Sequence, residues 1–203
     1  MYSKIGRITP AASGYNPLRG DQLGGLIVSG GKYQDSMLGG EHFFANALDM
    51  EVALYTATSG IGLIVYNPLN SGFILVPCLW SVIVYATSAT MTGMVLAVNS
   101  QPTDPTSVTA APLRGKCLLT GSSGLETGKC SAYSVATIIA PVLVWPLFHN
   151  TAAINTVGAE KIDGDLNGAF GFKPGTCAVI GALGAAGVNV DIAMTWKEVP
   201  IGT

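Results

Sequence analysis

Charged side chains are scarce in this chain of 203 residues. Lys and Arg number 10 and Asp and Glu number 12, so charged residues make up 11%, against about 25% in an ordinary soluble domain. The basic residues are scattered and the net charge is −2, whereas nucleic-acid binding requires clustered Lys and Arg. We therefore expect no nucleic acid as a partner. A surface with so few ions favours association with other protein surfaces.

Residues suited to metal or nucleophile chemistry are also few. The two histidines, His42 and His149, accompany no nucleophile pattern, and the four cysteines form no CxxC pair. We therefore expect neither an enzyme nor a cofactor. Buried free thiols from a reducing compartment are the simplest interpretation of the cysteines. Cys117 and Cys130 flank a Gly-rich loop, so a disulfide between them stays open as an alternative.

Two long uncharged stretches, between residues 51 and 104 and between residues 129 and 160, raise the question of membrane spans. Pro77 interrupts the first stretch, and Pro141 and Pro146 interrupt the second. Val, Ile, Thr, Tyr and Trp dominate both, which is typical of strands. The first residues, MYSKIGRITPAASGYNP, contain no apolar signal-peptide region. We expect no membrane association and folding in a cytoplasm.

The chain is rich in short apolar runs with the composition of β-strands. Leu63–Tyr66 and Phe73–Tyr85 flank a cluster of turn-forming residues, 67–72, which predicts a hairpin. The second run is apolar on both faces, and such a strand must be covered twice. The face opposite Trp80 is therefore predicted to be an oligomer interface, formed by Phe73, Leu75, Leu79 and Ile83.

The clearest strand is the last one. Val188, Val190, Ile192, Met194 and Trp196 alternate with mostly polar residues, which predicts a half-buried strand with these five on the core face. Short strands separated by Gly and Pro, with no convincing amphipathic helix, predict an all-β fold. At this length we expect an antiparallel jelly-roll-type β-sandwich over residues 51–203.

Residues 1–50 are expected to be an extended N-terminal arm and a lead-in segment. The first 25 residues show neither helical nor strand periodicity, and too little apolar surface to fold alone. Apolar anchors alternate there with basic residues, which is typical of a segment that orders on a partner. The predicted partner-binding residues are Tyr2, Lys4, Ile5, Arg7, Ile8, Tyr15, Leu18 and Arg19.

A weak calcium motif occurs near residue 165. Asp163, Asp165 and Asn167 match the first half of a calcium-binding loop, but Pro174 stands where the bidentate acid is needed. A polar turn is the favoured interpretation, and calcium is the alternative.

Several short motifs together resemble a family of small structural proteins of tailed-phage virions. The motifs are Leu18-Arg19-Gly20, Gly31-Lys32-Tyr33, Gly62–Pro68 with Ser71-Gly72, Phe172–Gly175 and Trp196–Pro200. The resemblance implies a jelly-roll capsid decoration or cement protein, commonly a homotrimer, which binds the major capsid protein on the outer capsid surface of the virion. A head-fibre or tail-tip module that binds a host receptor or glycan stays open, and exposed aromatic residues in a groove would favour it.

Overall fold

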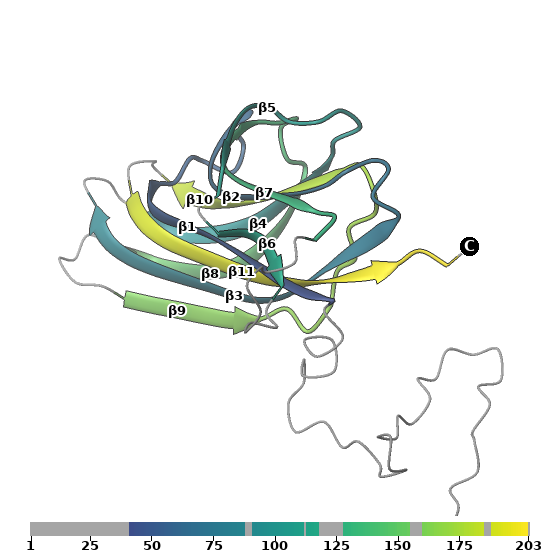
Figure 1. The fold of residues 1–203 in the computed structure, drawn as a ribbon. Coiled ribbons are helices and arrows are strands. Elements are labelled where there is room, and N and C mark those ends of the chain that lie inside the picture. Colours follow the sequence, from purple (N-terminus) through teal and green to yellow (C-terminus); the bar gives the residue numbers. More distant parts are fainter. Residues whose placement is uncertain are drawn as a thin grey trace, which may run out of the picture. The chain divides into compact units, whose positions relative to one another are not determined.

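The computed structural model describes residues 41–87, 91–111, 113–117, 128–154, 160–184 and 188–202. These residues belong to the compact unit Ser36–Thr203. They contain strands and connections but no helix, and the strands form two antiparallel sheets that pack face to face (Figure 1). The prediction of an all-β sandwich is confirmed. The predicted partner-binding residues of the arm, from Tyr2 to Arg19, lie outside the described residues.

The first sheet has five strands and the second has six. The first runs in the order β6 (Leu113–Cys117), β1 (His42–Glu51), β11 (Val188–Pro200), β3 (Phe73–Thr87) and β9 (Glu160–Asp165). The second runs in the order β5 (Thr106–Ala110), β7 (Ser131–Thr137), β2 (Ser59–Asn67), β10 (Thr176–Gly184), β4 (Met91–Ser100) and β8 (Leu143–Ile154). Because β1 starts at His42, the sandwich begins inside the range 1–50 that was predicted as arm and lead-in.

The predicted hairpin of β2 and β3 is wrong. These two strands belong to different sheets: β2 pairs with β7 and β10, whereas β3 pairs with β11 and β9. The turn formers between them carry the chain from one layer of the sandwich to the other. Local turn signals predicted the reversal correctly but could not decide between pairing in one sheet and packing across two.

The core between the sheets follows the alternation of β11. Val190, Ile192, Met194 and Trp196 are all buried, as predicted, while the side chain of the fifth, Val188, lies outside the described part of the structure. The same face continues to Glu198, which is only 3% exposed. Its carboxylate accepts hydrogen bonds from the backbone N–H of Lys129 (2.8 Å) and Cys130 (3.0 Å) and from the indole Nε1–H of Trp196 (3.2 Å). These donors satisfy a carboxylate that would otherwise be costly to bury.

The predicted oligomer face of β3 needs a correction at Leu75. Opposite β11, Met194 pairs with Trp80 and Trp196 pairs with Pro77, so β3 holds one extra residue at this point. Such a bulge reverses which alternate side chains face the core. Leu75 is therefore buried in the domain's own core, at 1% exposure.

Burial on both faces occurs in the second sheet. On β2, Leu63 and Val65 join the core between the sheets, while Ile64 and Tyr66 are buried in a second cluster on the other side. The connection between β1 and β2 contributes Tyr55 to that second cluster. Gly181 allows this approach, since a Cβ there would lie 2.8 Å from Cα of Tyr55. The chain itself therefore supplies the second cover.

Candidate binding site

Of the remaining predicted interface residues, Phe73 is half-buried at the start of β3 opposite Pro200, and the other two lie among charges. Leu79 is 39% exposed and pairs with Asp165, while Ile83 is half-buried and pairs with Lys161 on β9. Across β11, Ile83 pairs with Asp191. The outer face of this sheet therefore mixes isolated apolar side chains with charges, which is typical of a solvated surface.

The residues of the calcium motif lie on an exposed strand end and turn. Asp163 belongs to β9, and its carboxylate lies 3.7 Å from Nζ of Lys161. Asp165 accepts a hydrogen bond of 2.7 Å from the backbone N–H of Asn167, which has φ of 55°. Within the described ranges no three His, Cys, Asp or Glu residues gather as metal ligands. The geometry favours the polar turn.

Chelation tests this interpretation. We expect EDTA to leave the melting temperature unchanged, because the oxygen atoms of Asp163 and Asp165 already serve an ion pair and a turn. If calcium bound the folded protein but not the unfolded chain, it would raise the melting temperature, and the rise would depend on the calcium concentration. Thermal unfolding with EDTA and with added Ca²⁺ is the measurement. A melting temperature several degrees lower in EDTA would contradict the turn assignment.

The histidines and cysteines form no reactive centre in the described part of the chain. His42 is buried on β1 and His149 is exposed on β8. Cys130 is a buried free thiol, so the alternative of a bridge to Cys117 is wrong. Burial and the neighbouring carboxylate of Glu198 raise the pKa of the Cys130 thiol. Burial alone raises the pKa of Cys177 to about 12, so neither thiol is a nucleophile near neutral pH.

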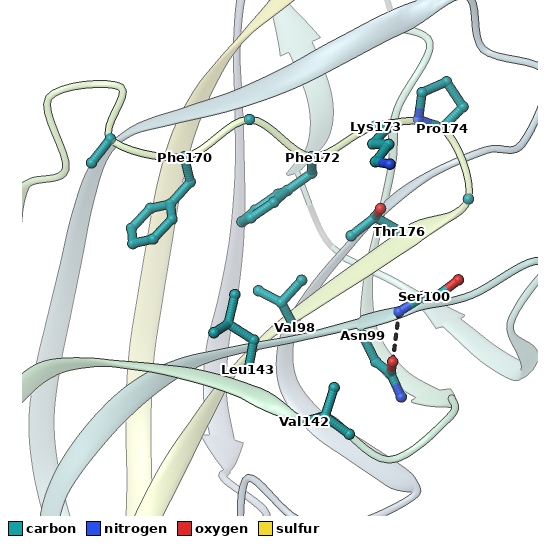
Figure 2. Close-up of a pocket in the computed structure, with 13 residues that line it drawn as sticks. Val98, Asn99, Ser100, Val142, Leu143, Phe170, Phe172, Lys173, Pro174 and Thr176 are labelled. Atoms are coloured by element: carbon teal, nitrogen blue, oxygen red, sulfur yellow. Dashed lines mark hydrogen bonds between the residues drawn. The ribbon is translucent and has the colours of Figure 1, made fainter.

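One end of the sandwich carries a pocket of about 600 Å³. The ends of β4 and β8 form one side of it, and the connection between β9 and β10 forms the other. Figure 2 shows the rings of Phe170 and Phe172 reaching from that connection toward Val98 and Leu143. The volume is within the range of ligand-binding pockets, and the lining is mainly apolar, as such pockets usually are.

Asn67 fixes one side of the pocket. Its side chain is fully buried, and Nδ2 donates hydrogen bonds to the carbonyl oxygens of Phe73 (2.9 Å) and Phe172 (2.8 Å). Its backbone carbonyl accepts the N–H of Gly175 at 2.8 Å. Phe172 also exchanges two backbone hydrogen bonds with Leu75. The pocket wall is thus attached to both sheets.

Gln101 holds the same wall against the end of β4. It is 3% exposed, its backbone N–H donates to the carbonyl oxygen of Gly175 at 2.7 Å, and its Oε1 accepts the N–H of Ile139 at 2.8 Å. Gln101 therefore joins the end of β4 to the β9–β10 connection and to the segment that precedes β8. Side chains held in this way need little reorganisation to bind a ligand.

The sequence signals for this site were present but were interpreted as turns. Asn67 and the Phe172–Gly175 motif belonged to the quoted resemblance. Their sequence separation hides the link, because the hydrogen bond from Asn67 to Phe172 spans 105 positions. A buried amide that bridges two loops cannot be distinguished from a turn residue in one sequence.

An exposed apolar segment adjoins the pocket. Among the described residues, ten large hydrophobic side chains are exposed, and four of them lie between positions 139 and 145. These are Ile139 (43%), Val142 (78%), Leu143 (56%) and Trp145 (48%). Trp145 also packs edge to face on Phe170, with ring centroids 4.9 Å apart. Exposed apolar patches of this kind mark interaction surfaces.

Comparisons with known proteins identify no relative of this chain. No protein-family model, curated protein or solved structure matches the chain. For the residues in the described ranges, no helix has the length and hydropathy that crossing a bilayer requires.

Proposed function

We propose that this chain is a non-enzymatic structural protein of a tailed-phage virion, which binds the outside of the assembled head and stabilises it. The strand order carries this proposal together with the sequence resemblance. When β1, β2, β3, β4, β8, β9, β10 and β11 are counted from one to eight, the sheets have the orders 1-8-3-6 and 2-7-4-5. This order supports a jelly roll, the fold of many viral capsid domains. Strands β5 to β7 are then an insertion that widens both sheets.

The mechanism is thermodynamic. A protein that binds the assembled shell but not its dissociated subunits stabilises the shell by mass action. In this proposal the major capsid protein is the partner, the chain forms a homotrimer, and the N-terminal arm orders on the shell. An extended segment that orders on binding can reach across a joint between subunits.

Deleting residues 1–25 tests the role of the arm. We expect the truncated protein to fold and oligomerise, because the described sandwich starts at β1 and its core is formed by β1 and the strands that follow it. We also expect it to lose binding to shells that lack their own copy of the protein. Co-sedimentation of both forms with such shells is the measurement, and sedimentation velocity without shells reports the oligomeric mass.

Each outcome of that experiment has a distinct meaning. A full-length variant with Lys4, Arg7 and Arg19 changed to Ser is the matched control, since it keeps the arm but removes its three basic side chains. Equal binding by truncated and full-length protein would mean that the sandwich, and not the arm, contacts the shell. If the full-length protein does not bind shells, the decoration role is wrong.

A head-fibre or tail-tip module that binds a host receptor or glycan is the second candidate. The observation that favours it is Trp145, which is 48% exposed and packs on Phe170 beside the pocket. Exposed aromatic rings supply apolar contact area at low entropic cost. Binding of the protein to host cells that lack any shell, and its loss on Trp145→Ala, would support this candidate over decoration.

A further inference from the structure

Among the described edge strands, β8 is the only long one without a charged residue, since β5 is also uncharged but has only five residues. Strand β8 is the last strand of its sheet and has 12 residues, none of them charged. The edge strand β9 has six residues and includes Glu160, Lys161, Asp163 and Asp165. Proteins usually guard edge strands with charges, because an open edge can pair with another chain. On β8 only Pro146 hinders such pairing, because proline has no backbone N–H to donate.

The start of β8 is exposed where the chain enters the strand beside the pocket. Val142 and Leu143 both line the pocket and are 78% and 56% exposed, because no other part of the described chain covers them. An open strand edge next to an apolar pocket is the arrangement that binds an extended peptide. The main chain of the peptide pairs with the edge, and alternate side chains enter the pocket.

The chemistry of the lining selects the class of ligand. Lys173 is the only charged residue in the lining, and among the described residues it forms no ion pair. The amide of Asn99 is already engaged, since Nδ2 donates to the carbonyl of Ala140 (2.6 Å) and Oδ1 accepts the N–H of Ser100 (2.7 Å). Besides these, only the hydroxyls of Ser100 and Thr176 are polar side-chain groups of the lining, so the pocket suits apolar groups next to one negative charge better than the many hydroxyls of a sugar.

The size of the pocket fits two side chains of an extended segment. Side chains at alternate positions of a strand lie on one face, about 7 Å apart. A volume of about 600 Å³ is more than one aromatic side chain needs. We infer that the pocket and the edge of β8 together bind an extended peptide segment of a partner protein, with two large apolar residues two positions apart and an acidic residue beside them.

This inference goes beyond the decoration role, because it concerns the sandwich and holds for any partner that presents such a segment. The probe is a set of short, blocked synthetic peptides with a Phe-Thr-Phe core followed by Glu. Three companions carry Lys in place of Glu, Ser in place of both Phe, or Pro in place of the central Thr. Binding to the full-length protein is measured by fluorescence anisotropy, and backbone amide shifts locate the site by NMR.

We expect the Glu peptide to bind best and to shift the amides of Val142, Leu143, Gly175 and Thr176. The Lys peptide should bind roughly fivefold more weakly, as for one solvent-exposed ion pair. The Ser peptide should lose its anchors, and the Pro peptide should lose a main-chain donor. Lys173→Glu should reverse the preference between the Glu and Lys peptides, whereas Lys161→Glu on β9 should leave it unchanged.

Blocking the pocket gives the second test. Val142→Asp should lower the affinity for the Glu peptide by at least about tenfold, because it places a carboxylate in the apolar pocket. Val108→Asp on β5 is the matched control, since Val108 is also exposed, at 46%. Both variants should fold, because both side chains already face solvent.

Several outcomes would overturn the inference. Equal binding of the Glu, Lys and Ser peptides, or no binding of any of them, would contradict it. Binding of dodecanoate without any peptide would assign the pocket to small apolar acids instead. A drop in oligomeric mass with Val142→Asp but not with Val108→Asp would assign the surface to a second copy of this chain.

Discussion

Replacing Asn67 with aspartate is expected to lower the free energy of unfolding by about 3–5 kcal/mol, because the new carboxylate would be a buried charge without a partner. In the native protein the Nδ2 group donates to the carbonyl oxygens of Phe73 and Phe172, and the side chain is fully buried. A carboxylate in the same place would face two carbonyl oxygens with no hydrogen to donate. For a domain of this size the loss corresponds to roughly 10 °C in melting temperature.

The destabilisation by Asn67→Asp should depend on pH. Burial and the two carbonyls raise the pKa of the introduced carboxyl in the folded state above its unfolded value. The penalty is therefore complete above the folded-state pKa and disappears as the pH falls below the unfolded-state pKa, where the protonated acid can donate one hydrogen bond. Urea unfolding at several pH values, compared with the wild type, is the measurement.

Two further variants separate charge from lost hydrogen bonding. Asn67→Ala removes both donated bonds without adding a charge, so we expect a smaller loss of about 2–3 kcal/mol that does not change with pH. Asn70→Asp places the same charge in the same connection, but Asn70 is exposed and the change should cost little. Full stability of Asn67→Asp at neutral pH would show that Asn67 does not hold the pocket wall.

Replacing Glu198 is expected to have the second-largest effect. Glu198→Gln keeps the shape of the side chain but turns one acceptor oxygen into an NH₂ group, which would face an N–H donor of Lys129, Cys130 or Trp196. Hydrogen bonds to charged groups contribute about 1.5–3 kcal/mol each, and a buried donor without an acceptor costs more. We expect a loss of about 2–4 kcal/mol for Gln and a larger loss for Ala.

The matched control for Glu198 lies nearby. Glu41 forms an ion pair of 3.3 Å with Lys197, but both side chains are partly exposed, at 41% and 37%. Glu41→Gln should therefore cost less than about 1 kcal/mol. Urea unfolding followed by tryptophan fluorescence measures both variants, and Trp196 reports the local change because its indole contacts Glu198. Equal stability of Glu198→Gln and Glu41→Gln would refute the role assigned to the buried carboxylate.

The position of Glu198 explains why residue 128 is a glycine. A Cβ on Gly128 would overlap Oε1 of Glu198. The absence of a side chain lets the backbone at Lys129 and Cys130 approach close enough to donate to the carboxylate. The start of β7 is thereby attached to the end of β11, although 68 positions separate Cys130 from Glu198.

The sequence by itself determined the fold class and the core face of β11. Strand periodicity is local: side chains alternate along one segment, so the alternation from Val190 to Trp196 is readable without knowledge of any partner strand. The same reasoning indicated the apolar run Leu63–Tyr66 of β2. It gives no sign of β9, because an edge strand can carry charges on its exposed side chains.

Only the tertiary structure decided which strands pair and which polar residues are buried. The bulge in β3 depends on its pairing with β11, and one extra residue places Leu75 in the core instead of on the surface. Asn67 and Glu198 are buried with hydrogen-bond partners that include Phe172 and Lys129, from segments distant in the sequence. No local pattern records such partners, since the cost of burying a polar group depends on what the fold places next to it.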